Sequence, residues 1–273
     1  MLIDTHAHLN FAAFNDDFSE SVKRSLDSDT WMINVGSQFS TSQKAVEIAL
    51  KYEKGVYAAI GLHPIHLETK VRKEIIDEKE EFEFTSREES FNQDNYKKLA
   101  INPKVVAIGE AGLDYFHSKN NKEKQKEFFV RQIKLAAELD LPLIVHCREA
   151  NSDVIEILKE EKKTYGKKLR GVIHCFSGGL SEAKEYIAMD FLLGFNGIIT
   201  FARDYDKVLL EIGLEHAVVE TDCPYLTPPP YRGQRNEPSY VKFVVEKIAQ
   251  IKGISVTEVE NITTENAKKL FRL

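Results

Sequence analysis

The sequence predicts an α/β fold, a (β/α)8 or TIM barrel formed as a single domain by residues 1–273. Three observations lead to this prediction. Short apolar runs alternate with segments of helical spacing, as in parallel strands joined by right-handed helical crossovers. The runs are continuously apolar, which is typical of strands covered on both faces. There are eight of them, the number that closes a barrel, and the chain has the usual length of one.

The predicted elements follow in a regular order, with no composition break that indicates a second domain. The expected strands are 2–8, 31–36, 56–64, 105–110, 141–146, 171–174, 191–197 and 217–222. The expected helices, where apolar residues recur every three or four positions, are 15–27, 40–51, 122–139, 152–165, 181–189, 238–252 and 257–271. A doubly wound open sheet could use the same units, but it would not gather eight strand ends at one mouth.

The pattern loosens between the third and fourth predicted strands. Residues 67–90 are crowded with Glu, Lys and Arg, relieved by a few Ile and Phe. We interpret this stretch as a solvated helix and an exposed excursion, within one extended charged connection at about 66–99.

Composition narrows the class of protein. Hydrophobic residues make up 42% and charged residues 29%, an ordinary globular balance. The net charge of −6 offers no globally basic surface for duplex DNA or membranes, so a polyanionic substrate would need a local basic patch or metal ions. Neither a signal peptide nor a membrane-spanning run is recognised, and three cysteines do not make a disulfide framework. We expect a cytoplasmic protein without an obligate protein partner.

Seven residues of metal-binding type stand at the ends of predicted strands. They are His6 and His8 on the first strand, His63 on the third, Glu110 on the fourth, His146 on the fifth, His174 on the sixth and Asp222 on the eighth. In a (β/α)8 barrel the active site is built from these carboxyl ends. His6 and His8 are two places apart and should point the same way, with Thr5 and Ala7 opposite.

This donor set suits a pair of divalent cations, which could be Zn, Mg, Mn or Ni. Because the first and eighth strands are neighbours in a closed barrel, His6, His8 and Asp222 should share one cation. His146 and His174 should share the other, with Glu110 as the bridge. Two cations about 3.5–4 Å apart can activate a water between them. Asp222 is also the candidate general base.

Six motifs then resemble the TatD-type metal-dependent deoxyribonucleases of the amidohydrolase superfamily. They are Asp4-Thr5-His6-Ala7-His8-Leu9, Gly61-Leu62-His63-Pro64, Gly109-Glu110-Ala111-Gly112-Leu113-Asp114-Tyr115, His146-Cys147-Arg148, His174-Cys175-Phe176-Ser177-Gly178 and Glu220-Thr221-Asp222-Cys223-Pro224-Tyr225-Leu226. Arg232-Gly233, Asn236-Glu237-Pro238 and the closing segment 266–271 continue the resemblance along nearly the whole chain.

The resemblance implies the same six ligands, His6, His8, Glu110, His146, His174 and Asp222, and places His63 near the scissile phosphate. It also implies a DNA exonuclease that works 3′ to 5′ and favours single strands. A glutamate on the fourth strand separates this group from relatives that bridge metals with a carbamylated lysine. Ala111 and Glu149 depart mildly from the family pattern, and the charged stretch is longer than expected, which affects substrate access.

Further residues near the ligand motifs are candidates for substrate contact. Arg148 and Arg232 could hold phosphates by paired hydrogen bonds. Three aromatic residues, Tyr115, Phe176 and Tyr225, could stack on unpaired bases, although packing in the core is an equal alternative for each.

The predicted function is therefore hydrolysis of phosphodiester bonds by a metal-activated water. The alternative keeps the metals and changes the bond: C–N or C–O hydrolysis, including deacylation of an aminoacylated nucleic acid. A metal-dependent scaffold without turnover is the third alternative.

Overall fold

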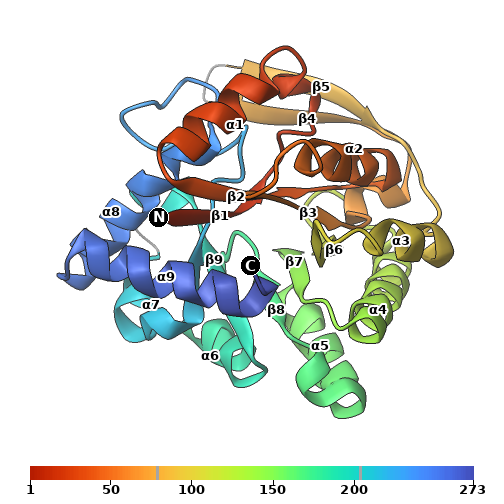
Figure 1. Cartoon of the computed structure of the whole chain (residues 1–273). Coiled ribbons are helices and arrows are strands. Elements are labelled where there is room, and N and C mark those ends of the chain that lie inside the picture. The colour runs from red at the N-terminus through yellow and green to blue at the C-terminus, as the bar shows by residue number, and fades with distance from the viewer. Residues whose placement is uncertain (78–79, 203–204) are drawn as a thin grey trace.

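Eight parallel strands form one sheet, in the order β1-β2-β3-β6-β7-β8-β9-β10 (Figure 1). This computed structural model describes residues 1–77, 80–202 and 205–273, with 72–77 and 80–84 described by their backbone alone. The strands of the sheet are β1 (Leu2–Ala7), β2 (Thr30–Val35), β3 (Val56–Ile60), β6 (Val105–Asp114), β7 (Leu143–Arg148), β8 (Gly171–Ile173), β9 (Phe191–Phe195) and β10 (Ala217–Val219).

The first and last strands close the sheet into a nearly complete barrel. Just beyond β10, the Asp222 amide donates to the His6 carbonyl at 2.8 Å, and the His8 amide donates to the Cys223 carbonyl at 2.9 Å. The TIM-barrel prediction is confirmed.

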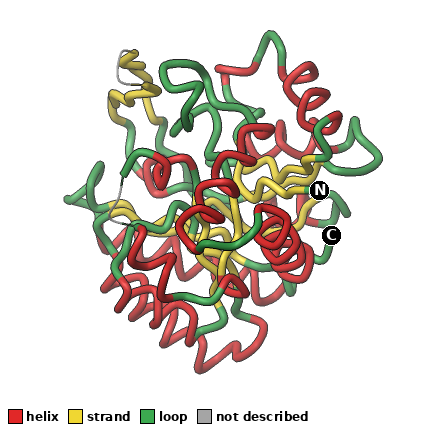
Figure 2. The backbone as a smooth tube through the Cα atoms, turned by 90° about the vertical axis from the view of Figure 1, so that its left-hand side faces the viewer, coloured by secondary structure: helices red, strands yellow, loops and turns green. Residues whose placement is uncertain are grey.

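Helices surround the barrel between successive strands (Figure 2). They are α1 (Phe18–Asp27), α2 (Phe39–Ala49), α3 (Gln93–Ala100), α4 (Lys122–Leu139), α5 (Asn151–Tyr165), α6 (Leu180–Ala188), α7 (Asp206–Glu211), α8 (Val241–Lys252) and α9 (Val256–Phe271). Short 3-10 helices occur at η1 (Ala12–Phe14), η2 (Pro64–Leu67), η3 (Gly166–Lys168), η4 (Gly197–Thr200), η5 (Leu214–His216) and η6 (Pro238–Tyr240). None of the described helices combines the length and apolar character needed to cross a membrane.

The connection between β3 and β6 differs from the prediction. In place of a solvated helix, β4 (Lys70–Asp77) and β5 (Glu80–Ser86) pair as an antiparallel hairpin that stands away from the barrel (Figure 2). The helix prediction for 67–90 is wrong because charge density outweighed a strand signal: 81–84 alternates Glu and Phe with period two. Residues 78–79 of that stretch lie outside the described part of the chain.

Buried apolar residues fall into two clusters on opposite faces of the strands. On β10, Val218 belongs to an inner cluster, whereas its neighbours Ala217 and Val219 belong to the cluster beneath the helices. On β8, Val172 is inner and Ile173 outer. This alternation follows from strand geometry and extends to the residue after each strand, which determines what points into the mouth.

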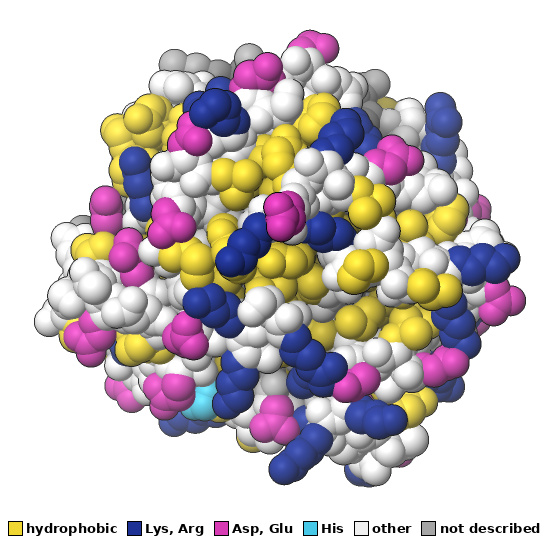
Figure 3. All heavy atoms as spheres, in the orientation of Figure 1, with side chains coloured by type: hydrophobic (Ala, Val, Ile, Leu, Met, Phe, Trp, Pro, Cys, Tyr) yellow, Lys and Arg dark blue, Asp and Glu magenta, His cyan; other side chains and the backbone are white. Residues whose placement is uncertain are grey.

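The inner cluster is closed at one end by the last helix. Ala267, Leu270 and Phe271 of α9 pack there with residues that point into the barrel, such as Ile3 and Ile33. Both chain termini lie on this side (Figures 1 and 2), so it is the amino end of the strands. Its surface mixes basic, acidic and hydrophobic side chains (Figure 3). The predicted ligands lie toward the opposite, carboxyl end.

Candidate metal centre

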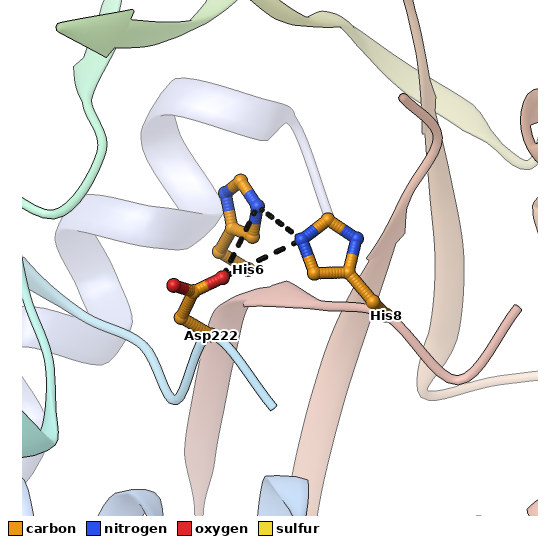
Figure 4. A group of neighbouring side chains, drawn as sticks. All are labelled: His6, His8 and Asp222. Atoms are coloured by element: carbon orange, nitrogen blue, oxygen red, sulfur yellow. Dashed lines mark hydrogen bonds and ion pairs between the residues drawn. The ribbon is translucent and has the colours of Figure 1, made fainter. Parts of the chain in front are cut away.

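The histidine pair on β1 meets Asp222 where the barrel closes (Figure 4). The Nε2 atoms of His6 and His8 are 3.0 Å apart, and Asp222 Oδ1 lies 3.4 Å from His8 Nε2 and 3.9 Å from His6 Nε2. His8 Nδ1 is 2.9 Å from the Val35 carbonyl oxygen, to which only a protonated Nδ1 can donate. Its Nε2 lone pair is thereby left to bind a cation.

A local irregularity in β1 directs these two histidines inward. Ile3 and His6 both point into the barrel although they are three residues apart, which a regular strand cannot do. The pairing with β2 shifts register between Asp4 and Ala7 and so changes the parity. Ala7 then packs outward, as predicted.

Asp4 stabilises this irregularity from within the barrel wall. Its fully buried carboxyl group accepts hydrogen bonds from the amides of His6 at 3.1 Å and Thr221 at 2.8 Å, as well as from the Thr221 hydroxyl. Burial raises the pKa of Asp4 to about 8 despite these hydrogen bonds. The contact ties the start of the β1 tip to the segment that carries Asp222.

Glu110 occupies the centre of the cluster. Its Oε1 lies 2.7 Å from His146 Nδ1, 3.5 Å from His63 Nε2 and 3.8 Å from His174 Nε2, and its Oε2 lies 3.5 Å from His6 Nε2. Burial by itself would raise the pKa of Glu110, but the surrounding imidazoles outweigh it and hold the pKa well below its usual range. The carboxylate therefore stays ionised, and its two oxygens face different histidines, His146 and His6.

His174 is held by a second carboxylate behind it. Its Nδ1 is 2.9 Å from Glu220 Oε1, and the same oxygen accepts the Cys175 amide at 2.7 Å. Glu220 is completely buried just beyond the end of β10. With Nδ1 facing this carboxylate, the His174 ring presents Nε2 to the mouth, where it lies 3.8 Å from Glu110 Oε1.

His146 faces carboxylates at both ring nitrogens. Glu110 Oε1 lies at Nδ1, and Asp114 Oδ2 lies 3.2 Å from Nε2. Asp114 also accepts the His117 amide and faces His117 Nδ1 at 2.7 Å. The close approach of β6 and β7 depends on Gly112, because a Cβ there would lie 1.9 Å from the His146 carbonyl oxygen.

Burial lowers the pKa of two histidines in the cluster. For His6, desolvation and the neighbouring His174 outweigh the attraction of Glu110. For His63, desolvation and the nearby His146 lower the pKa well below 6.5. Both imidazoles are therefore neutral at physiological pH, the form whose ring nitrogen can bind a metal ion.

The other two strand-end histidines are shifted the opposite way. Burial alone would lower the pKa of His146, but hydrogen bonds to Asp114 and Glu110 raise it to about 9. The pKa of His174 is likewise raised to about 10, because the charges on Glu220 and Asp222 outweigh burial. A cation bound among these carboxylates would take the place of such protons.

The residues present fit divalent cations. Three sets of ligand atoms each lie within 4.8 Å of one another: His6, His8 and Asp222; His6, Glu110 and His174; His63, Asp114 and His146. The first set is the one predicted for one cation. His146 and His174 fall in different sets and are joined through Glu110, so their sharing of the second cation stays a prediction. Mixed imidazole and carboxylate donors suit Zn, Mn, Mg or Ni.

Two of the aromatic residues predicted as substrate contacts are buried. Phe176 is 2% exposed and packs against Tyr186 and Phe195, so of the two alternatives for this residue the structure favours core packing over base stacking. Its position after His174 suggested the mouth, but its ring turns into the core between barrel and helices. Tyr115 is also buried.

The remaining predicted contacts are accessible. Arg148 is exposed, and Arg232 and Tyr225 are half-buried. The guanidinium of Arg148 lies 4.2 Å over the ring of Phe116, and that of Arg232 lies 4.2 Å over the ring of Phe201. The sequence analysis did not single out either phenylalanine. The only available signal was that each follows a strand end by a few residues.

Comparison with known proteins places the chain. A family model described as TatD related DNase matches residues 3–272. The chain belongs to the TatD related DNase family. The resemblance inferred from its motifs is thereby confirmed.

The relatives of this family member are similar along their full length. The chain is 43% identical over 276 residues to YabD of Bacillus subtilis, named an uncharacterized metal-dependent hydrolase, and the match covers both proteins completely. The solved structure of YJJV, a TatD homologue from Escherichia coli, has a TM-score of 0.86 at 26% identity and covers 100% of this chain and 98% of that one. A TatD family hydrolase from Entamoeba histolytica shares the fold, with a TM-score of 0.81 at 24% identity and coverage of 99% and 97%. With its donor set, the protein is a metal-dependent hydrolase of the TatD family.

Proposed function

We propose that the protein is a deoxyribonuclease that removes nucleotides from the 3′ end of single-stranded DNA with two divalent cations. This proposal rests on one observation: the ligand atoms of five residues lie close together at one mouth of the barrel. These residues are His6, His8, Glu110, His174 and Asp222. Family membership supports the phosphodiester bond as the target. The arginine at the end of β7 supports an anionic substrate.

Two cations, when bound, would acidify water and neutralise charge on the phosphate. His6, His8 and Asp222 would hold one, and His146 and His174 the other, with Glu110 reaching both. The Glu110 side chain is 6% exposed, less than the 16% of Asp222, and this enclosure suits a ligand that bridges two cations.

Asp222 is the carboxylate placed to accept a proton. Its side chain is 16% exposed, and its Oδ1 lies 3.4 Å from His8 Nε2 and 3.8 Å from His174 Nε2. Burial would raise the pKa of Asp222, but His174 and His8 keep it lowered and the group ionised. The residue adopts a left-handed φ of 57°, which Asp tolerates better than most residues.

His63 is placed to donate to a phosphate oxygen. Its Nδ1 accepts the amide of Ile65 at 3.1 Å, so the proton of the neutral ring is on Nε2. That Nε2 faces the cluster 3.5 Å from Glu110 Oε1. We assign it to the non-bridging oxygen of the scissile phosphate.

The test is hydrolysis of a single-stranded oligonucleotide labelled at either end, after chelation and addition of Zn, Mg, Mn or Ni. We expect metal-dependent loss of the 3′ label first, and slower loss from a blunt duplex. Glu110→Gln should lower kcat/KM by at least about 100-fold, the upper end of what outer partners of a metal site cost. Glu138→Gln, on the exposed face of α4, is the matched control.

The alternative bond classes belong in the same assay. Proteins that share only the fold include a β-aspartyl dipeptidase, at 14% identity and a TM-score of 0.62. A panel of amides, esters and aminoacylated nucleic acid should be hydrolysed far more slowly than the oligonucleotide. Faster hydrolysis of any of these, or full activity in Glu110→Gln, would overturn the proposed function.

A further inference from the structure

Two phenylalanines stand out among the exposed side chains of the described residues. Phe116 is 49% exposed and Phe201 is 44% exposed, whereas the other large hydrophobic side chains exposed there are aliphatic. Phe116 follows the end of β6 by two residues, and Phe201 follows η4 after the end of β9. Both therefore lie on connections at the mouth. Their exposed rings do not contribute to the packing of the core, and exposed apolar surface of this kind is typical of a binding site.

Each phenylalanine carries an arginine on one face of its ring. Arg148, at the end of β7, pairs in register with Asp114 just before Phe116, and the Tyr115 amide donates to its carbonyl at 2.9 Å. Its guanidinium forms no hydrogen bond or ion pair with another residue in the described part of the chain. Arg235, by contrast, is bound to Asp17 at 2.6 and 2.8 Å, which leaves it unsuited to a ligand.

Short chains of contacts connect the first pair to the metal centre. Arg148 is two residues beyond His146 on the same strand, so both side chains leave the same face. The Phe116 ring lies edge-on to His117, with centroids 4.9 Å apart. His117 contacts Asp114, which contacts His146.

The second pair lies on the other side of His174. Asn196, at the start of η4, donates to Glu220 Oε1 at 3.3 Å, and Glu220 holds His174. Phe201 ends that segment, and Arg232 reaches it from the loop after β10, where its Nη1 donates to the Thr227 carbonyl at 3.0 Å. In the sheet order β7-β8-β9-β10, the two pairs thus flank the strand that leads to His174.

We propose that the Phe116–Arg148 and Phe201–Arg232 pairs bind the two nucleotides that flank the scissile phosphate of a single strand. This rests on the proposed function and deepens it. The guanidinium of Arg148 lies 4.2 Å over the Phe116 ring and has no hydrogen bond or ion pair among the described residues, so its N–H groups are available to phosphate oxygens. An unpaired base stacks on the exposed part of the layer, a contact that tolerates any sequence. Bases inside a duplex are already stacked, so the preference for single strands follows from these rings.

The first experiment measures kcat and KM of the metal-loaded protein on a single-stranded oligonucleotide and on a small aryl phosphodiester. Phe116→Ala and Phe201→Ala should each raise the oligonucleotide KM about tenfold, within the range that loss of one stacked base gives. The preference for oligonucleotide over the small diester should fall in parallel. Ile101→Ala, at an 81% exposed aliphatic site, is the control.

The second experiment separates phosphate binding from stacking. With a hydrolysis-resistant phosphorothioate oligonucleotide, Arg148→Ala should reduce the slope of log affinity against log salt by about 0.7, the contribution of one single-strand phosphate. Arg272→Ala, an exposed arginine beside the C-terminus, should leave the slope unchanged. Phe116→Ala should weaken binding without changing the slope.

Abasic substitution supplies the decisive comparison. Removing the base beside the scissile phosphate should weaken binding by the wild type but not by the matching phenylalanine variant. Equal losses in both, or an unchanged KM in both variants, would overturn the inference while leaving the nuclease function intact. Phe-dependent binding without any hydrolysis by the wild type would instead overturn the proposed function and leave the inference standing.

Discussion

The two ends of the barrel are built from the same strands but from opposite kinds of side chain. At the amino end, Val172 and Val218 pack in an apolar cluster that Phe271 helps to close. Two residues farther along the same strands, His174 and Glu220 stand in a buried polar network. Side chains two residues apart on a strand point to the same face. The inward-pointing residue at one position therefore packs in the stabilising core, and the inward-pointing residue two places later belongs to the polar site at the mouth.

The difference indicates which end supplies stability and which supplies function. Apolar burial at the amino end stabilises the fold at roughly 25 cal/mol per Å² without needing a ligand. The mouth buries imidazoles and carboxylates, which is unfavourable unless each has a partner or a cation. Substitutions at the two ends should therefore separate into losses of stability and losses of activity.

The largest stability effect should come from Phe271→Ala. This side chain is 2% exposed at the base of the barrel, and removing it from the cluster should cost about 3–5 kcal/mol of unfolding free energy. Urea unfolding measures the loss. The kcat/KM of the protein that stays folded at 25 °C should remain close to the wild-type value.

Val256→Ala is the control on the same helix, because that side chain is 41% exposed. Its unfolding free energy should change by no more than about 0.5 kcal/mol. If Phe271→Ala lowered kcat/KM in proportion to stability, the two ends would not be independent and the comparison would fail.

The amino-acid pattern predicted the mouth best where strands are regular. On β7 and β8 the apolar alternation continues to His146 and His174, so their inward direction could be inferred from position alone. On β1 the sequence identified His6 and His8 as a pair. It did not show the register shift that directs them inward, because a shift depends on pairing with β2.

Contacts between strands and loops were harder to predict. Asp114, the last residue of β6, contacts His117 in the loop that follows and His146 on β7, and no local pattern determines the contact with His146. For Phe176 the sequence left base stacking and core packing as equal alternatives, and its ring packs into the core. Phe116 likewise follows a strand end by only a few residues, yet its ring is exposed. Burial of such a residue is decided by tertiary packing rather than by spacing.

A smaller effect at the mouth should come from Glu220→Gln. The substitution keeps the size of the side chain but removes the charge that faces His174 Nδ1 at 2.9 Å. Loss of such a partner should weaken cation affinity about 10- to 100-fold, measured by competition with a chelator. The unfolding free energy of metal-free Glu220→Gln should differ from that of the metal-free wild type by much less than the loss expected for Phe271→Ala.

Glu215→Gln is the matched control, because Glu215 faces His216 at 3.7 Å on the opposite side of the barrel. Its cation affinity should equal that of the wild type. Equal affinity in Glu220→Gln as well would show that Glu220 only fills space.

The smallest effect tests the amino end again with a milder change. Ser255 caps α9, where its side chain accepts the Glu258 amide at 3.2 Å. Ser255→Ala should cost about 1 kcal/mol, the usual value of such a cap. For a chain of this size the melting temperature should fall by about 2–3 °C. Ser152→Ala, an exposed serine in the first turn of α5, should leave it unchanged. Because the cap acts through the helix that closes the amino end, kcat/KM and cation affinity should both be preserved. A loss of cation affinity with an unchanged melting temperature would mean that α9 positions the ligands as well as closing the barrel.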